Sequence, residues 1–165
     1  MFLRKIPTAL YFLILSIGSA LIGFIGMALQ YYLQLNPCPY CIFQRILYFE
    51  IAFFSFLMFV FGAFTKVWKT FGVLTCLSSL LGLGLAIYQS VMQLYPGLLP
   101  ECGFSEPNAI ERFVDFLGMR YPEWFLATGF CSSVEWSMFG LSMANWSALC
   151  FLSIAIYLGI LLWKR

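Results

Sequence analysis

Residues 36–64 read NPCPYCIFQRILYFEIAFFSFLMFVFGAF, in which two closely spaced cysteines are followed by a long apolar run. From residue 42 onward, this run contains only two charged residues, Arg45 and Glu50. A helix needs roughly 20 mainly apolar residues to cross the hydrocarbon core of a bilayer, and residues 42–64 supply that length. We therefore expect a membrane-spanning helix here, with the cysteine pair at or just before its first turn.

Three other stretches have the same apolar character. They cover about residues 8–29, 71–94 and 145–163. The whole chain is 62 % apolar and 10 % charged, with a mean hydropathy of +0.91, whereas soluble domains are typically about 25 % charged. The sequence therefore predicts an all-α membrane protein, a four-transmembrane-helix bundle that forms a single integral membrane domain over residues 1–165. A cleaved signal peptide fits the first stretch less well, because its apolar run exceeds the roughly 7–15 residues of a signal core.

Basic residues next to the spans predict the direction of the chain, because they tend to stay on the cytoplasmic side. Four crossings put most of them on one side: Arg4, Lys5, Lys66, Lys69, Lys164 and Arg165. We therefore expect both termini to be cytoplasmic. The loops at about residues 30–41 and 95–144 would then face outward, in the periplasm of a bacterial inner-membrane protein.

The longer outer loop contains an amphipathic pattern. Four apolar residues share one helical face: Ile110, Phe113, Val114 and Leu117. This spacing predicts a short amphipathic helix. Such a helix could lie along the membrane surface or pack on another part of the loop.

Composition also excludes several functions. A formal net charge of +2 with no cluster of Lys and Arg gives no indication of nucleic-acid binding. The chain has no histidine, which excludes every His-containing metal site and the commonest general base. Six cysteines remain as the reactive groups.

Four of the six cysteines fall on the outward side of the predicted topology: Cys38, Cys41, Cys102 and Cys131. The other two, Cys76 and Cys150, lie within spans, where a thiol usually behaves as a small apolar group, and we assign them no role. Cys41 stands where the free N–H groups of a helix start favour a thiolate. Arg45 follows four residues later on the same helical face and adds positive charge.

Three interpretations of the four outward cysteines remain open. They could form two structural disulfides in a non-catalytic membrane protein. A four-cysteine zinc site fits less well, because Cys102 and Cys131 are widely spaced and do not form a second C-x-x-C. A redox relay is favoured, because a purely structural pair would not need to lie at the membrane surface beside an arginine.

The segment NPCPYCIFQR (residues 36–45) resembles the signature of the DsbB family of disulfide-generating membrane proteins. The resemblance extends over nearly the whole chain. It includes Leu94-Tyr-Pro96 ahead of Cys102, and Cys131 followed by Trp136. Vitamin K epoxide reductase-type proteins are a poorer match, because their C-x-x-C falls late in the bundle and their other pair comes earlier.

The resemblance implies a protein-dithiol:quinone oxidoreductase. A periplasmic thioredoxin-fold oxidant of the DsbA type would be reoxidised by a Cys102–Cys131 disulfide. The Cys38–Cys41 disulfide would then reoxidise the reduced Cys102 and Cys131 thiols. The electrons would pass from Cys38 and Cys41 to ubiquinone or menaquinone.

Arg45 would hold the quinone, and Met143 and Trp146 match family positions near it. Because Cys102 would meet a soluble partner, we expect it on a flexible, projecting loop. Gln44 and Gln89 depart from the residues that some family members have at these places, and these departures could alter the preference for a quinone.

Overall fold

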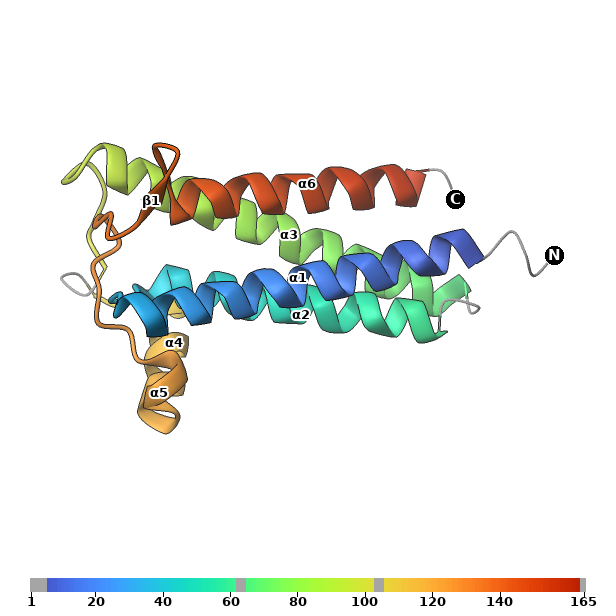
Figure 1. Cartoon of the computed structure of the whole chain (residues 1–165), viewed down its shortest axis with the longest axis horizontal. Coiled ribbons are helices and arrows are strands. Elements are labelled where there is room, and N and C mark those ends of the chain that lie inside the picture. The colour runs from blue at the N-terminus through green and yellow to red at the C-terminus, as the bar shows by residue number, and fades with distance from the viewer. Residues whose placement is uncertain (1–5, 62–64, 103–105, 164–165) are drawn as a thin grey trace.

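Four long helices lie along one another in the computed structural model, which describes residues 6–61, 65–102 and 106–163 (Figure 1). They are α1 (Ile6–Leu33), α2 (Pro39–Phe61), α3 (Thr65–Leu94) and α6 (Met143–Trp163). Each contains a segment long and apolar enough to cross a membrane. The predicted all-α four-helix membrane bundle is therefore confirmed.

The helices extend beyond several of the predicted ends. α2 begins at Pro39 and not near residue 42, because the fixed φ of proline and its missing N–H suit the first position of a helix. This start places Cys41 inside the first turn. Of the basic residues used to orient the chain, Arg4, Lys5, Lys164 and Arg165 lie outside the described residues, as does the side chain of Lys66.

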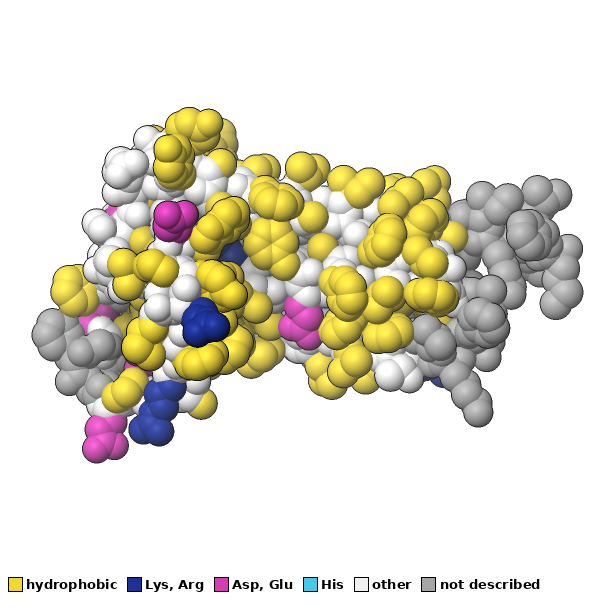
Figure 2. All heavy atoms as spheres, turned by 90° about the horizontal axis from the view of Figure 1, so that it is seen from below, with side chains coloured by type: hydrophobic (Ala, Val, Ile, Leu, Met, Phe, Trp, Pro, Cys, Tyr) yellow, Lys and Arg dark blue, Asp and Glu magenta, His cyan; other side chains and the backbone are white. Residues whose placement is uncertain are grey.

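The packing order of the helices brings the cysteines to one end. α1 packs on α2, α2 on α3, and α3 on α6. The start of α1 and the end of α6 lie at one end of the bundle, while the α1–α2 turn and the α3–α6 segment lie at the other (Figure 1). We call the second end the cysteine end. On the face seen in Figure 2, hydrophobic side chains cover the helices, and most charged side chains gather at the cysteine end.

Small residues allow the helices to approach closely, as membrane helices require. A Cβ added at Gly82 of α3 would lie 2.5 Å from the Phe151 ring of α6, and one at Gly23 of α1 would lie 2.9 Å from the Phe49 ring of α2. Glu50, the acidic residue within α2, accepts a hydrogen bond of 3.0 Å from Ser78 Oγ of α3.

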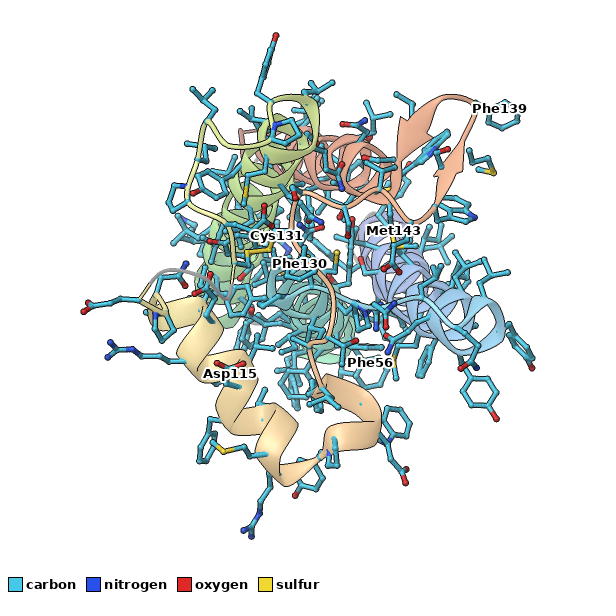
Figure 3. All side chains as sticks on the ribbon, turned by 90° about the vertical axis from the view of Figure 1, so that its left-hand side faces the viewer. Phe56, Asp115, Phe130, Cys131, Phe139 and Met143 are labelled. Atoms are coloured by element: carbon cyan, nitrogen blue, oxygen red, sulfur yellow. A yellow bond between two sulfur atoms is a disulfide. The ribbon has the colours of Figure 1, made fainter. Side chains whose placement is uncertain are left out.

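The long segment between α3 and α6 contains α4 (Ala109–Arg120) and α5 (Pro122–Phe125). A helix is therefore present where the amphipathic pattern occurs, and a capping box between Asn108 and Glu111 starts it. α4 packs against α5 and against the beginning of α2, where Asn108 Nδ2 donates a 2.8 Å hydrogen bond to the Tyr40 hydroxyl. Figure 3 shows α4 and α5 to one side of the bundle.

A short hairpin leads into the last helix. Its strands β1 (Ser137–Met138) and β2 (Leu141–Ser142) are antiparallel. Phe139 and Gly140 at its tip both have positive φ, 54° and 77°, as a two-residue turn of this kind requires. The hairpin places Met143 and Trp146 at the start of α6, beside the cysteine end.

Candidate active site

The C-x-x-C pair sits at the first turn of α2. Cys38 immediately precedes the helix, and its sulfur accepts a 3.4 Å hydrogen bond from the backbone N–H of Cys41. Cys38 Sγ in turn donates to Cys41 Sγ at 3.1 Å. The pKa of the Cys38 thiol is raised well above its usual value, first by this side-chain hydrogen bond and then by burial. The hydrogen bond and burial therefore favour the protonated form of the Cys38 thiol.

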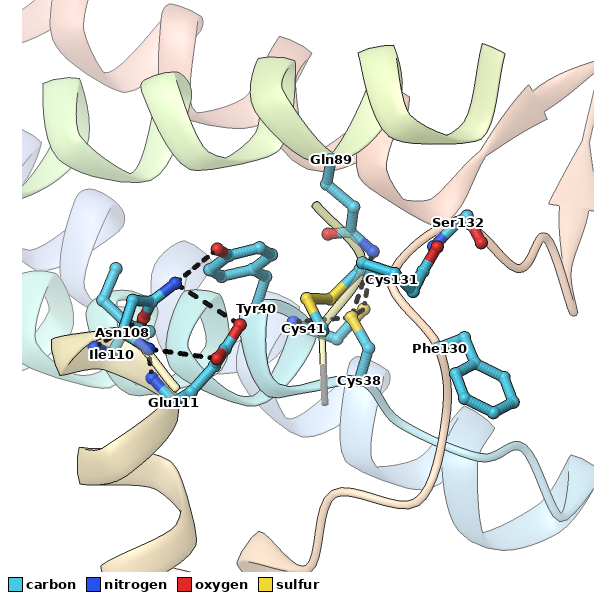
Figure 4. The surroundings of a disulfide bond; sticks show 12 residues. Cys38, Tyr40, Cys41, Gln89, Asn108, Ile110, Glu111, Phe130, Cys131 and Ser132 are labelled. Atoms are coloured by element: carbon cyan, nitrogen blue, oxygen red, sulfur yellow. Dashed lines mark hydrogen bonds between the residues drawn. A yellow bond between two sulfur atoms is a disulfide. The ribbon is translucent and has the colours of Figure 1, made fainter. Parts of the chain in front are cut away.

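A buried glutamine contacts the same sulfurs, and a second buried glutamine is hydrogen-bonded to the first. Gln89 of α3 points its Nε2 at Cys41 Sγ, at 3.0 Å, and at Cys38 Sγ, at 3.3 Å (Figure 4). Gln44 of α2 donates from its Nε2 to Gln89 Oε1 at 3.0 Å. The sequence identified these glutamines only as departures from the family, because their contact depends on how α2 and α3 are aligned.

The other two outward cysteines, Cys102 and Cys131, form a disulfide with a Cα–Cα distance of 5.7 Å, as the resemblance implies. This bond uses two of the ligands that a four-cysteine zinc site would need. The disulfide belongs to a buried cluster with Cys38, Tyr40 and Met92, and Cys41 packs against this cluster. The two cysteine pairs are therefore neighbours (Figure 4).

The expectation that Cys102 lies on a projecting loop is wrong. Cys102 is 4 % exposed and Cys131 is 0 % exposed. The reason is that the chain around Cys131 is hydrogen-bonded to the turn between α1 and α2. The N–H groups of Thr128 and Gly129 both donate to the carbonyl oxygen of Pro37, at 3.0 and 3.1 Å.

Further contacts strengthen this docking of residues 128–135. The Asn36 N–H donates to a carboxylate oxygen of Glu135 at 2.5 Å. A Cβ added at Gly129 would lie 2.1 Å from the backbone oxygen of Asn36, so only glycine allows this approach. The Ser132 N–H also donates to Glu101 Oε1 at 3.0 Å, which joins the segments that carry the two disulfide cysteines.

Cys41 also borders an apolar cavity of about 210 Å³ between α1, α2 and α6. Every residue that the sequence assigned to cofactor binding lines this cavity: Arg45, Met143 and Trp146. Arg45 is 9 % exposed, and its Nη1 donates to Gln30 Oε1 of α1. The arginine is therefore held beside the cavity by a hydrogen bond to α1.

Other residues of the cavity wall were not predicted. They include Gly26, Tyr48, Trp136 and Cys150. The Tyr48 ring stacks on Phe151 with centroids 4.2 Å apart. Cys76 and Cys150, to which we assigned no role, both pack against the apolar core of the bundle, and Cys150 also lines this wall.

Comparison with known proteins identifies the family. Residues 7–161 match the family model described as "Disulfide bond formation protein DsbB". A relative named "Disulfide bond formation protein B" in Dechloromonas aromatica (strain RCB) is 50 % identical over 165 residues, covering 100 % of this chain and 98 % of the relative. A relative with the same name in Polaromonas sp. (strain JS666 / ATCC BAA-500) is 38 % identical, covering 88 % of this chain and 84 % of the relative. Another in Aromatoleum aromaticum (strain DSM 19018 / LMG 30748 / EbN1) is 34 % identical, covering 90 % of this chain and 88 % of the relative. The chain therefore belongs to the DsbB family of disulfide bond formation proteins.

Proposed function

We propose that this protein is a protein-dithiol:quinone oxidoreductase. It reoxidises a periplasmic thioredoxin-fold oxidant of the DsbA type and passes the electrons through its two cysteine pairs to a membrane quinone. The observation that carries this proposal is the position of Cys41. Its sulfur packs against the buried cluster that holds the Cys102–Cys131 disulfide, and it also borders the apolar cavity.

Electrons and protons balance over two exchanges and one final transfer. A thiolate of the reduced partner attacks the Cys102–Cys131 disulfide, and the partner's second thiol releases the mixed disulfide, leaving the partner oxidised and Cys102 and Cys131 as thiols. These thiols then reduce the Cys38–Cys41 disulfide in the same way. The reduced pair finally gives up two electrons and two protons and closes again as a disulfide.

The residues around the cavity suit a quinone. A bound quinone would supply the two-electron, two-proton acceptor. The cavity volume of about 210 Å³ is below the roughly 300–1,000 Å³ typical of pockets for drug-sized ligands, so it has room for a head group while an isoprenoid tail would extend into lipid. Arg45 would supply a positive charge to the quinone, and Met143 and Trp146 would help to line its site.

The cellular location forms part of the proposal. Six basic residues flank the spans in sequence near the start of α1, near the start of α3 and after α6: Arg4, Lys5, Lys66, Lys69, Lys164 and Arg165. The segment between α3 and α6 carries two, Arg112 and Arg120. By the positive-inside rule, the termini would be cytoplasmic and the cysteine end periplasmic. This places the cysteine pairs in an oxidising compartment, at the level of the bilayer where a lipid-soluble quinone can reach Cys41.

The alternative function is a non-catalytic membrane protein with two structural disulfides. It explains the Cys102–Cys131 bond, but it gives no reason for a second pair to lie beside both that bond and an apolar cavity with a buried arginine.

Thiol trapping in membranes distinguishes the two functions. Membranes containing the protein would be acid-quenched and treated with a mass-tagging maleimide, in a Cys76→Ser/Cys150→Ser background that removes the other thiols. We expect the C-x-x-C pair to be a disulfide when quinone is oxidised, and to become reduced when quinone is depleted and a reduced DsbA-type protein is added. If both pairs remain oxidised under every condition, the structural alternative is correct.

A further inference from the structure

Gln44 and Gln89 form a hydrogen-bonded chain that ends on the C-x-x-C sulfurs. Both side chains are buried, with 4 % and 2 % exposure. Gln44 lines the apolar cavity, and the Gln89 amide lies between the Gln44 amide and the sulfurs of the pair. The chain therefore connects the wall of the cavity to the reacting cysteines.

The first hydrogen bond determines which end of the Gln89 amide faces the sulfurs. Gln44 donates from its NH₂ group to Gln89 Oε1, so the oxygen of Gln89 is already used as an acceptor. The NH₂ group of Gln89 has two N–H donors, and it faces Cys41 Sγ at 3.0 Å and Cys38 Sγ at 3.3 Å. A reversed amide would bring its oxygen against a sulfur that becomes negative.

We propose that Gln89 is a catalytic hydrogen-bond donor that stabilises the thiolate of Cys41, and that Gln44 is a positioning residue that holds the Gln89 amide in the donating direction. The proposal rests on the proposed function, because it requires the Cys38–Cys41 pair to open and close. A hydrogen bond to a charged acceptor is stronger than one to a neutral thiol. Gln89 therefore stabilises the reduced pair more than the disulfide and makes the pair a stronger oxidant.

The assignment fits the other contacts of Cys41 Sγ. Cys38 Sγ supplies one donor at 3.1 Å, and Gln89 supplies a second from a different helix. Glutamine does not titrate, so this donor keeps its strength at every pH at which the protein is folded. Gln89, held by Gln44, thus supplies the Cys41 thiolate with a hydrogen bond that a protonated, charged side chain such as histidine could otherwise supply.

The test measures the thiols directly. In reduced, detergent-solubilised protein, the rate of iodoacetamide alkylation of Cys41 would be measured near pH 6 by peptide mass spectrometry. The fraction of Cys38–Cys41 disulfide would be measured after equilibration in thiol redox buffers. We expect Gln89→Met to slow alkylation about tenfold, as loss of one hydrogen bond to a charged group implies. The redox equilibrium should shift about tenfold toward the disulfide, which is about 30 mV for two electrons.

Two further variants test the role of Gln44. Gln44→Met frees the Gln89 amide to rotate and should slow alkylation by less than Gln89→Met does. The double variant should be no slower than Gln89→Met alone, because Gln44 acts only through Gln89. If the two effects simply add, Gln44 acts on the sulfurs by another route and the positioning role is wrong.

Gln93→Met is the matched control. Gln93 lies one turn further along α3 and also makes two polar contacts, with Ser142 Oγ at 2.6 Å and the Ser133 carbonyl at 3.3 Å, but these do not involve the C-x-x-C sulfurs. It should lower thermal stability as Gln89→Met does while leaving the alkylation of Cys41 unchanged. The proposal is overturned if Gln89→Met alters neither thiol measurement, or if Gln93→Met alters them equally.

If Gln89→Met does not fold, the alkylation rate of Cys41 in Gln44→Met becomes the test. An unchanged rate in that variant overturns the proposal. These measurements need neither quinone nor partner, so they remain distinct from a failure of the proposed function, which the membrane trapping experiment would reveal.

Discussion

Arg45 is a buried cation whose surroundings favour a role at the cavity. It lies one turn after Cys41 in α2 and donates to Gln30 of α1. Gly26 of α1 faces it, and a Cβ added there would lie 3.4 Å from Arg45 Nε. Burying a charge in a membrane protein is costly and usually reflects function. A side chain that only extended toward the interface would not need a partner on another helix.

We expect Arg45→Ala to raise the apparent KM for quinone by about tenfold or more, because a hydrogen bond to a charged group contributes about 1.5–3 kcal/mol. Exchange between the two cysteine pairs should remain largely intact. Steady-state assays over a range of quinone concentrations would measure this, with Arg112→Ala as the control. Arg112 is a cation on α4 that donates to the Pro107 carbonyl, away from the cavity. An unchanged KM in Arg45→Ala would remove Arg45 from the quinone site.

Gly129 determines how closely the Cys131 segment approaches the α1–α2 turn. A methyl group at this position would meet the Asn36 oxygen at 2.1 Å, so Gly129→Ala must move one backbone segment away from the other. Overpacking of this kind typically costs about 1–3 kcal/mol. We expect a lower thermal midpoint and slower transfer of electrons from the Cys102–Cys131 pair to Cys38–Cys41.

Gly84→Ala provides the control for Gly129→Ala, because a Cβ at Gly84 would meet no described atom within 4 Å. Samples quenched with a maleimide at successive times would follow the transfer of electrons from the Cys102–Cys131 pair to Cys38–Cys41 in both variants. Equal rates in Gly129→Ala and the wild type would show that this close approach does not control exchange between the pairs.

The segment of residues 128–135 must serve two opposing purposes. Docked on the α1–α2 turn, it holds the disulfide beside Cys38, but the same docking buries both sulfurs that a soluble partner would need to reach. The proposed function would therefore require a state in which this segment has moved. The hydrogen bonds between Asn36 and Glu135, at 2.5 and 3.2 Å, hold one end of it.

We expect Glu135→Ala to change two rates in opposite directions. In a Cys131→Ser background, it should speed up capture of an oxidised DsbA-type partner severalfold, because the segment opens more often and the Cys102 thiolate can attack the partner's disulfide, forming the mixed disulfide and releasing one partner thiol. With all four cysteines present, it should slow transfer to Cys38–Cys41. Gel analysis of mixed disulfides and maleimide trapping would measure the two rates. Changes of the same sign would contradict the docking argument, and a partner bound to Cys38 would overturn the proposed order of transfer.

The elements differ in how far the sequence predicts them. Long apolar runs predict α1, α2, α3 and α6, because crossing a bilayer constrains length and composition together. Helical spacing similarly predicts α4. The docking of residues 128–135 was not predictable, because its hydrogen bonds join residues more than 90 positions apart. The position of Gln89 depends in the same way on the packing of α3 against α2, whereas Cys41 and Arg45 share a local helical face that the sequence shows directly.

The molecule as a whole has a chemical difference between its two ends. Both described termini are at one end, and the cysteines, the acidic residues and the cavity are at the other (Figure 1). The proposed function requires that the cysteine end lie on the periplasmic side of the membrane and the other end on the cytoplasmic side.

Single cysteines introduced into a variant in which all six native cysteines are replaced by serine would test this orientation. We expect Glu106→Cys to be labelled by a membrane-impermeant maleimide in intact spheroplasts. Lys69→Cys should be labelled only after the membrane is permeabilised. The opposite pattern would place the cysteine pairs in the cytoplasm and contradict the proposed location.

The measurement that tests the proposed function most directly is turnover by the purified protein. Detergent-solubilised protein would be mixed with a reduced DsbA-type protein and a ubiquinone or menaquinone analogue, and quinone absorbance would be followed beside a Cys41→Ser control. We predict loss of quinone absorbance that requires both the partner and Cys41. No loss of absorbance with either quinone class, in protein shown to be folded, would contradict the relay and favour two structural disulfides.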